Sequence, residues 1–459
     1  MFRRILIANR GEIAVRIIRT CIEMNIDTVA VYSTADKDSL HVKLATKAVC
    51  IGPAKASQSY LNMNSILTAA LDNHCDAIHP GFGFLSENSD FARLCEENNI
   101  KFIGPKADVI DAMGNKAMAK TMMRKGSVPV VPGSDGALKD YDEAKEIADR
   151  IGYPVLLKAS AGGGGRGMRR AYSEEELKKA YDEAKAEARA CFGNDEMYIE
   201  KLIVNPRHIE FQILADEMGN VVHLGERDCS IQRKNQKLIE ESPCMLLSDE
   251  LRDKMGTAAV NAAKASGYTN AGTVEFVLDG DNNFYFIEMN TRIQVEHGVT
   301  EMVTGIDLIK EQIRIAFHEP LGFEQGDIKL KGHAMECRIN AEDPAKGFLP
   351  NSGKITFLNL PGGPGVRVDT MLYNGYETSP FYDSMMAKII VHAPTRLEMI
   401  RKMRRALMEI STEGITTTSD FEYLILFHPD FIKGKYNVGF IEEHMDEILS
   451  WDAFGEGNE

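Results

Sequence analysis

The chain has 459 residues, and 53 Lys and Arg against 68 Asp and Glu give it a formal net charge of −15. Its apolar content of 44% excludes a disordered chain, and its length predicts about three domains. The acidic excess argues against a partner that is nucleic acid or an anionic membrane, because phosphate affinity comes from clustered Lys and Arg. A small anionic ligand in a local basic pocket stays possible on this composition.

The N-terminus and the cysteines indicate the compartment. The apolar stretch at residues 5–8 is too short for a signal-peptide core, and no apolar run reaches the roughly 18 residues of a membrane helix. The eight cysteines are scattered without a Cys-x-x-Cys pair, which argues against a zinc site or a disulfide framework. We therefore expect a cytoplasmic protein with reduced thiols, and we expect Cys229 to be a structural thiol.

Residues 1–114 predict an N-terminal α/β domain. Apolar strands at residues 5–8, 28–32, 76–79 and 101–103 alternate with amphipathic helices. This alternation is typical of βαβ units with a parallel sheet. No Gly-x-Gly-x-x-Gly follows the first strand, so an ordinary dinucleotide-binding domain is not indicated.

From residue 115 onward, helices mix with strands of hairpin type. We expect a central α+β domain at residues 115–328, with a lid at about residues 131–203. A strand-rich C-terminal domain at residues 329–446 would contain a basic helix at residues 396–409. Residues 447–459 read as an acidic tail.

A glycine-rich loop at residues 161–167 follows a predicted strand at residues 154–158. Consecutive glycines let backbone N–H groups surround phosphate oxygens, and Lys158 and Arg166 add positive charge. A strand at residues 168–172 follows the loop, which predicts a hairpin flap instead of a Rossmann strand-to-helix turn. A plain flexible linker is the alternative, and we favour phosphate contact.

Two alternating runs flank residues 280–283 and predict a β-hairpin. Pairing residue 279 with residue 284 puts Glu275 opposite Glu288, with Asn290 on the same face. Opposed carboxylates repel, but two carboxylates and an amide oxygen suit Mg²⁺ shared with nucleotide phosphates. The opposite, apolar face would carry Val274, Phe276, Leu278, Tyr285, Ile287 and Met289. An exposed acidic face is the alternative, and a one-residue slip would break the pairing.

The polar row continues at every second residue, through Glu288, Asn290, Arg292, Gln294 and Glu296. An extended backbone would point all of these side chains to one side. Beyond the metal ligands, the row offers a guanidinium for an oxyanion, an amide and a carboxylate base. A solvated strand rim is the alternative, but the apolar face behind the row favours the floor of a site.

Besides the glycine loop, the chain contains EMNTRIQVEH at 288–297, IANRGEIA at 7–14, HPGFGFLSEN at 79–88 and HAMECRINAEDP at 333–344. Together these stretches resemble the biotin carboxylase family of the ATP-grasp superfamily. Further matches extend to residues 381–385, so the resemblance covers nearly the whole chain. It implies the biotin carboxylase fold: an N-terminal parallel βαβ domain, an ATP-grasp domain with a mobile glycine-loop lid, and a strand-rich C-terminal domain.

The resemblance also implies site residues. Positions that match ATP contacts are Lys116, Lys158, Gly164, Gly165, Glu200, Lys201, Leu202, Ile203, His208, Gln232, Glu275 and Glu288. Positions that match the Mg²⁺ (or Mn²⁺) site are Glu275, Glu288 and Asn290. The bicarbonate positions are Lys237, Arg292, Gln294, Val295 and Glu296, and the biotin positions are Phe82 and Arg338. Without the resemblance, His208 would read as the outer face of a strand and Lys116 as a helix-surface lysine.

The implied reaction is ATP-dependent carboxylation of biotin by bicarbonate, which gives carboxybiotin, ADP and phosphate. Glu296 would act as the general base on bicarbonate to give carboxyphosphate, and Arg338 would hold the biotin enolate. The lysines and the metal would neutralise charge at the γ-phosphoryl group. The residues implied in catalysis are Glu296, Arg292, Arg338 and Lys237.

A few positions depart from the commonest family pattern: Phe82 stands for Tyr, Ala161 for Gly, Asn235 for His and Gly298 for Pro. These changes lose a hydroxyl, stiffen the loop, remove a frequent nucleotide contact and loosen the segment beside Glu296. None of them removes a charge that the implied mechanism needs.

The chain lacks the Ala-Met-Lys-Met stretch around a biotinylated lysine, so biotin is expected on a separate carrier protein. The resemblance favours the biotin carboxylase subunit of acetyl-CoA carboxylase, acting towards malonyl-CoA and fatty acid synthesis. Its expected partners are the carrier and carboxyltransferase subunits and a second copy in a homodimer. A subunit of a pyruvate or acyl-CoA carboxylase, another ATP-grasp ligase, and a non-catalytic nucleotide-sensing module are the alternatives. The last of these would be expected to lose carboxylates among Glu275, Glu288 and Glu296.

Overall fold

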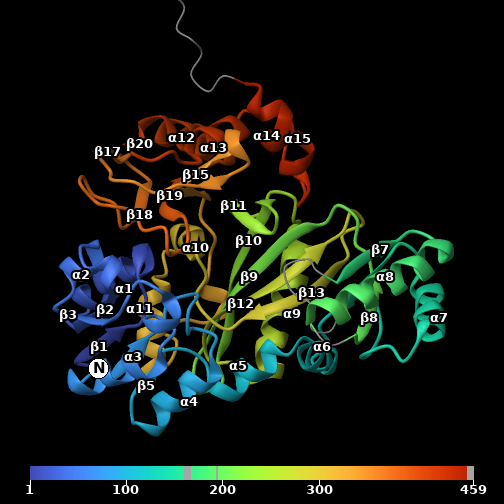
Figure 1. Cartoon of the computed structure of the whole chain (residues 1–459), viewed down its shortest axis with the longest axis horizontal. Helices are drawn as coiled ribbons and strands as arrows, with labels where there is room; N and C mark the ends of the chain where they lie inside the picture. The colour runs from blue at the N-terminus through green and yellow to red at the C-terminus, as the bar shows by residue number, and fades with distance from the viewer. Residues whose placement is uncertain (160–166, 193–194, 452–459) are drawn as a thin grey trace, which may run out of the picture.

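The structure is a computed structural model that describes residues 1–159, 167–192 and 195–451 (Figure 1). The N-terminal part contains β1 (Arg4–Ile7), α1 (Gly11–Glu23), β2 (Asp27–Ser33), α2 (Leu40–Leu44), β3 (Lys47–Gly52), α3 (Met63–Asp72), β4 (Ala77–His79), α4 (Ser89–Glu97), β5 (Lys101–Phe102) and α5 (Ala107–Gly114). Its strands form a parallel sheet in the order β3-β2-β1-β4-β5. The predicted βαβ layer is confirmed, and β3 is a strand that the sequence pattern did not predict.

A three-stranded sheet follows α6 (Lys116–Lys125), and we call it the small sheet. Its strands are β6 (Val155–Ala159), β7 (Met168–Ala171) and β8 (Met197–Lys201), in the order β7-β6-β8. Helices α7 (Tyr141–Ile151) and α8 (Glu174–Phe192) pack against these strands. Strands β6 and β7 pair antiparallel, which confirms that a hairpin flanks the glycine-rich segment. Residues 160–166, including Gly164, Gly165 and Arg166, lie outside the described residues.

The small sheet has a core of its own. Apolar side chains between Leu138 and Ile199, from α7, α8 and the three strands, pack together in one cluster. Figure 1 shows this unit at the right, at the far side of the molecule from the N-terminal part. The small sheet is therefore a separately packed unit that meets the remainder of the fold along a limited boundary.

An eight-stranded antiparallel sheet, which we call the large sheet, dominates the rest of the molecule. Its strands run in the order β13-β12-β9-β10-β11-β14-β19-β18. Its elements and those packed around it are β9 (Arg207–Ala215), β10 (Val221–Arg233), β11 (Gln236–Ser242), α9 (Asp249–Ser266), β12 (Asn270–Leu278), β13 (Phe284–Asn290), α10 (His297–Thr304), α11 (Leu308–Ala316), β14 (His333–Asn340), β18 (Val366–Thr370) and β19 (Met385–Ala393). Because β11 pairs with β14, this sheet continues through residue 329.

The C-terminal helices cover one end of the large sheet. They and the short remaining strands are β15 (Glu342–Asp343), β16 (Leu349–Pro350), β17 (Phe357–Asn359), α12 (Arg396–Glu409), β20 (Ser411–Glu413), α13 (Ser419–Ile425), α14 (Pro429–Ile432) and α15 (Phe440–Leu449). Helix α12 matches the predicted basic helix, and Thr395 with Glu398 forms its capping box. Across the described parts of the chain, no helix combines the length and apolarity needed to span a membrane.

The hairpin β12–β13 has the predicted register only near the site. Glu275 pairs with Glu288 and Thr273 with Asn290, as expected. The pairing then shifts, so that Leu278, not Asp279, faces Phe284. This β-bulge reverses the alternation on the outer half of β13.

The bulge also changes which side chains of β13 face the core. Phe286 packs into the core with Phe276, whereas Tyr285 is only half-buried. Ile287 lines the cavity described below instead of the core. The prediction that Tyr285 and Ile287 share the core face with Met289 is therefore wrong, because one inserted residue moves every side chain beyond it to the opposite face.

Candidate active site

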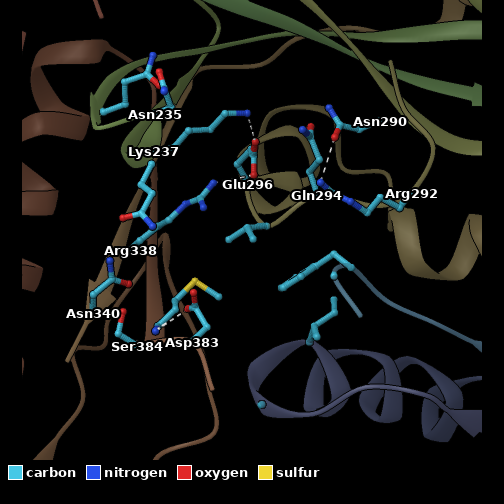
Figure 2. A pocket seen from close by; sticks show the side chains of 18 of the residues that line it. Asn235, Lys237, Asn290, Arg292, Gln294, Glu296, Arg338, Asn340, Asp383 and Ser384 are labelled. Carbon is cyan, nitrogen blue, oxygen red and sulfur yellow. Dashed lines mark hydrogen bonds and ion pairs between the residues drawn. The ribbon is translucent and has the colours of Figure 1, made fainter. Parts of the chain in front are cut away.

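A cavity of about 1140 Å³ lies between the N-terminal part, the large sheet and the segment at residues 381–385 (Figure 2). It gathers predicted residues that are widely separated in the chain. They are Phe82, Lys116, His208, Gln232, Lys237, Glu275, Glu288, Asn290, Arg292, Gln294, Val295, Glu296 and Arg338. The predicted residues Lys158, Glu200, Lys201, Leu202 and Ile203 lie instead on the small sheet and just after it.

The polar row after Glu288 lines this cavity, although its backbone is not extended throughout as predicted. Strand β13 ends at Asn290, and Glu296 is the residue that precedes α10. All five side chains nevertheless face the same cavity. The helix that starts at His297 fixes the end of the row, so Glu296 lies at the junction of a loop and a helix.

Lys237 is the cationic centre of the cavity floor. Its ammonium lies 2.6 Å from Oε1 of Glu296, 2.5 Å from Oε2 of Glu210 and 3.3 Å from Oε1 of Glu275. Burial opposes ionisation of Glu296, but Lys237, Arg338 and Arg227 outweigh it and hold the pKa of Glu296 well below its usual range. Glu296 is therefore a carboxylate at neutral pH in this state.

Arg338 closes the other side of Glu296. Its Nη2 lies 2.8 Å from Oε2 of Glu296, and its Nε donates to Oε1 of Glu240 over 2.6 Å. Figure 2 shows Lys237 and Arg338 on either side of Glu296. One carboxylate is thus held by two cations from different strands, β11 and β14, which fixes its position in the cavity.

Two buried residues that the sequence pattern did not single out support this floor. Arg227 is fully buried and donates to Glu210, Gln212, Thr273, Gln294 and Thr300 at 2.6 to 3.0 Å. Glu210 is also fully buried, between Arg227 and Lys237. The available signal was a run of polar residues, at His208, Glu210 and Gln212 on β9 and at Glu226–Asp228 on β10, within otherwise apolar strands. Polar side chains that are buried in a sheet need partners from neighbouring strands.

The predicted metal residues meet across the bulged hairpin. Oε1 of Glu275 accepts hydrogen bonds from Asn290 at 2.9 Å and from Gln294 at 2.8 Å, and Oε2 lies 3.1 Å from Nε2 of His208. Burial and then the charge of Glu275 raise the pKa of Glu288. A cation between the two carboxylates would remove that repulsion, so these residues fit Mg²⁺.

His208, Glu210 and Glu275 could also each bring one ligand atom within 4.8 Å of one another. The Lys237 ammonium already lies 2.5 Å from Oε2 of Glu210. A second cation at that position would be repelled by Lys237, which favours the hairpin carboxylates Glu275 and Glu288 as metal ligands.

Arg292 is oriented by a glutamate from the N-terminal part. Its Nε donates to Oε2 of Glu87 over 2.8 Å, and its Nη2 donates to Oδ1 of Asn290 over 3.0 Å. Glu87 belongs to the stretch at residues 79–88, and nothing in the sequence pattern assigned it a role. Arg292 therefore connects the N-terminal part, through Glu87, to Asn290, one of the predicted metal residues.

On the small sheet, the lysines predicted to contact the nucleotide form ion pairs and hydrogen bonds with nearby protein groups. Lys158 pairs with Oε1 of Glu200, and Lys120 lies 2.7 Å from Oε2 of the same residue. The Lys201 ammonium donates to the backbone carbonyls of Gly152 and Tyr153 at 3.0 and 2.8 Å. The Lys201 side chain thus holds the backbone that precedes β6. The Lys158 side chain instead forms an ion pair with Glu200 on the neighbouring strand.

The surroundings of Asn235 and Gly298, two departures from the family pattern, are defined by the structure. Asn235 lies in the turn between β10 and β11, has a φ of 64° and lines the cavity. At Gly298, an added Cβ would lie 2.3 Å from Cδ1 of Ile390. A larger residue at 298 would therefore need Ile390 to move.

Cys229 is buried, and burial raises the pKa of its thiol, in agreement with a structural thiol.

Comparison with known families covers the chain in three segments. Residues 1–110 match the biotin carboxylase N-terminal domain, and residues 336–443 match the biotin carboxylase C-terminal domain. Residues 115–323 match the ATP-binding domain of the carbamoyl-phosphate synthase L chain. The chain belongs to the biotin carboxylase family. It is an ATP-dependent ligase of the kind that works within carboxylase complexes.

Relatives of known name match nearly the whole length of this chain. Biotin carboxylase 1 of Bacillus subtilis is 56% identical over 445 residues, which are 97% of this chain and 99% of the relative. The 2-oxoglutarate carboxylase small subunit of Hydrogenobacter thermophilus is 54% identical over 444 residues, which are 97% of this chain and 94% of the relative.

Solved biotin carboxylase structures have the same fold. The biotin carboxylase domain dimer of Hydrogenobacter thermophilus 2-oxoglutarate carboxylase, crystallised with MgADP, ADP and bicarbonate, has a TM-score of 0.91 at 53% identity. The match covers 98% of this chain and 99% of that one. The Campylobacter jejuni biotin carboxylase, in a β,γ-ATP complex, has a TM-score of 0.91 at 51% identity and covers 97% and 99%.

Proposed function

We propose that this biotin carboxylase uses ATP and bicarbonate to carboxylate biotin on a separate carrier protein, as the first half-reaction of acetyl-CoA carboxylase. The observation that carries the proposal is the position of Glu296, 2.6 Å from Lys237 and 2.8 Å from Arg338 in the cavity. A carboxylate base between two cations is the arrangement that bicarbonate activation and enolate stabilisation both need.

Glu296 acts as the general base, with Lys237 and Arg292 binding the bicarbonate anion beside it. When bicarbonate takes over part of the Lys237 charge, the proton affinity of Glu296 rises, and it can accept the bicarbonate proton. The bicarbonate oxygen then attacks the γ-phosphorus of ATP, ADP leaves, and carboxyphosphate forms. Gln294 and the segment at Val295 complete this anion site.

Carboxyphosphate breaks down to CO₂ and phosphate beside the biotin ring. The phosphate removes the proton from N1′ of biotin, and Arg338 stabilises the resulting enolate while N1′ attacks CO₂. Phe82 supplies an apolar surface for the ring, since it lines the same cavity. Arg338 is well placed for this role because Glu240 and Glu296 fix its guanidinium.

The ATP site lies between the large sheet and the small sheet. Glu275, Glu288 and Asn290 would hold Mg²⁺ (or Mn²⁺), which supplies positive charge to the ATP phosphates when it is bound. Lys116 and Lys158 bind phosphate oxygens. The remaining residues of this proposed site are Gly164, Gly165, Glu200, Lys201, Leu202, Ile203, His208 and Gln232, with the two loop glycines outside the described residues.

The proposed setting is a cytoplasmic homodimer with a biotin carboxyl carrier protein and carboxyltransferase subunits. The name of the Bacillus subtilis relative supports a free-standing biotin carboxylase. Relatives named as subunits of pyruvate carboxylase and of 2-oxoglutarate carboxylase, both 54% identical, support the same half-reaction with another acceptor. We also propose domains at residues 1–114, 115–328 and 329–446, with a tail at 447–459.

Bicarbonate-dependent ATP cleavage stimulated by free biotin tests the enzymatic proposal. We expect ADP release to require bicarbonate and Mg²⁺ and to rise with biotin concentration. Folded, Mg²⁺-supplied protein without such cleavage would refute the function. The acceptor is then identified by adding the natural carrier and carboxyltransferase subunits and comparing acetyl-CoA, pyruvate and 2-oxoglutarate; carboxylation of either keto acid would refute the acetyl-CoA assignment.

A further inference from the structure

A lysine on α6 that the sequence pattern did not single out lies against the proposed ATP residues. The Lys120 ammonium is 2.7 Å from Oε2 of Glu200. The other oxygen of Glu200, Oε1, forms an ion pair with Lys158. One carboxylate thus has two lysines as counter-ions, and they come from different parts of the fold.

The two lysines differ in where they are anchored. Lys158 lies on β6 and Glu200 on β8, which are neighbours in the small sheet. Lys120 lies in the middle of α6, which packs against α9 and β13 next to the large sheet. The ion pair between Lys120 and Glu200 therefore joins the small sheet to the part of the molecule that carries the metal residues.

Removing a counter-ion from the Glu200 carboxylate would be unfavourable, because Glu200 is only 6% exposed and water cannot replace the lost charge. Burial opposes its ionisation, but Lys158 and Lys120 outweigh burial and lower the pKa of Glu200. A buried carboxylate whose cation is removed is strongly unfavourable. Yet Lys158 has to give up part of its contact with Glu200 when it binds the phosphates of ATP.

We propose that Lys120 is a positioning residue of the ATP site: it keeps Glu200 compensated, so that Lys158 can turn from Glu200 to the ATP phosphates. This inference rests on the proposed ATP-binding function. Without Lys120, the same movement of Lys158 leaves the buried Glu200 charge with less compensation, and ATP binds more weakly. Because the cost arises only when phosphates attract Lys158, the loss depends on the phosphates and not on the nucleoside.

A purely structural ion pair would behave differently. The Lys120 side chain is 22% exposed, and ion pairs with partly exposed lysines commonly add little stability. Removing such a pair would change the unfolding temperature slightly. It would alter the binding of nucleoside and nucleotide to the same extent, because Lys158 would have no part in the effect.

Equilibrium titrations of the full chain with MgATP and with adenosine separate these cases. The variants are Lys120→Met, Lys120→Arg, Glu200→Gln and the Lys120→Met, Glu200→Gln double variant. Lys125→Met is the matched control, because Lys125 is an exposed lysine on the same helix. Thermal unfolding verifies that each variant is folded, and Lys120→Gln serves as the second variant if Lys120→Met does not fold.

Lys120→Met is expected to weaken MgATP binding about 10- to 100-fold, equivalent to about 1.4–2.8 kcal/mol, and to leave adenosine binding within about twofold. Lys120→Arg restores MgATP binding, and Lys120→Met has little effect in the Glu200→Gln background, because no buried charge then needs compensation. Lys125→Met leaves both affinities unchanged.

MgATP affinity within twofold of wild type in Lys120→Met would overturn the inference. Equal losses for MgATP and adenosine, or a full Lys120→Met effect in the Glu200→Gln background, would overturn it as well. A wild-type chain that does not bind MgATP at all would instead refute the proposed function, so the two failures are distinguishable.

Discussion

The large sheet and the small sheet hold their charged side chains in different ways. On the large sheet, Lys237 and Arg227 are embedded among buried carboxylates and amides from several strands. On the small sheet, Lys158 and Glu200 form one ion pair at the edge of a separate core, with Lys120 reaching in from α6. In the proposed reaction the first arrangement is largely formed in the free protein, whereas the second has to rearrange so that Lys158 can bind the ATP phosphates.

The two arrangements suit different steps of the proposed reaction, because one holds its side chains rigidly and the other lets them move. A dense network of buried charges holds its geometry, because moving one group leaves its partners uncompensated. The proposed base and the bicarbonate ligands gain from such rigidity. The proposed phosphate ligands need the opposite, since a separately packed sheet can approach a nucleotide and withdraw from it.

Removing Arg227 should break the large-sheet network most severely. Arg227→Met leaves the fully buried Glu210 without its guanidinium partner, so we expect a loss of about 3–5 kcal/mol in unfolding free energy. Chemical denaturation measures it. Arg150→Met, an exposed arginine on α7, is the control and should change stability by less than about 0.5 kcal/mol. A small change in Arg227→Met would show that the network does not depend on this residue.

Glu296→Gln should separate the chemistry from nucleotide binding. The amide cannot accept the bicarbonate proton, so we expect biotin carboxylation to fall about 100- to 1000-fold. MgATP affinity should stay within about threefold, because the phosphate ligands lie on other elements. Steady-state kinetics and nucleotide titration measure the two quantities. Near-native turnover would contradict the role of Glu296 as the base.

Glu288→Gln and Lys158→Met should distinguish the two sheets within the ATP site. Both variants weaken MgATP binding, but only Glu288→Gln removes a proposed metal ligand and should raise the Mg²⁺ concentration for half-maximal activity about tenfold. Lys158→Met should leave that concentration unchanged. Titrating Mg²⁺ at fixed saturating ATP measures the difference, and equal shifts in both variants would argue against separate roles.

Glu12, on the N-terminal wall of the cavity, predicts a pH dependence of stability. Burial raises its pKa to about 7, although Lys388 opposes the shift. A folded state with a raised carboxyl pKa is stabilised at low pH, and that stability is lost as pH rises from about 4.5 through about 7. Glu12→Gln cannot ionise at position 12. Between pH 5 and pH 8 we therefore expect the unfolding free energy of Glu12→Gln to fall less than that of wild type, by roughly 2–3 kcal/mol.

Thermal or urea unfolding at several pH values checks the Glu12 prediction. Glu23→Gln, at the end of the same helix, is the control, because Glu23 is exposed. A difference between Glu12→Gln and wild type that is constant with pH would contradict it.

The elements around the site were predictable where local pattern and register agree. Alternation on both sides of the turn at residues 280–283 placed Glu275 opposite Glu288, and the structure has that pair. The bulge that puts Ile287 at the cavity and Phe286 in the core was not predictable, because it depends on how β13 packs against the rest of the sheet.

Supporting residues were harder to predict than the residues they support. Nothing in the sequence pairs Arg227 with Glu210. The two residues become partners because β9 and β10 lie side by side and place them directly opposite each other. Lys120 looked like any lysine on an amphipathic helix. Its partner is 80 residues away in the chain, and such separations are decided by tertiary packing.

Residue patterns alone were enough to predict the parallel N-terminal layer, the opposed carboxylates of the hairpin, the polar row that lines the cavity and, through the motifs, the biotin carboxylase family. These features depend on short-range periodicity and on residue chemistry, both of which can be read locally. Three further features became clear from the folded chain: β14, β18 and β19 extend the large sheet, Arg338 pairs with Glu296, and two lysines share Glu200. A buried charge is stable when it has a partner, and these partners are brought together by long-range strand pairing and packing, which local patterns do not encode.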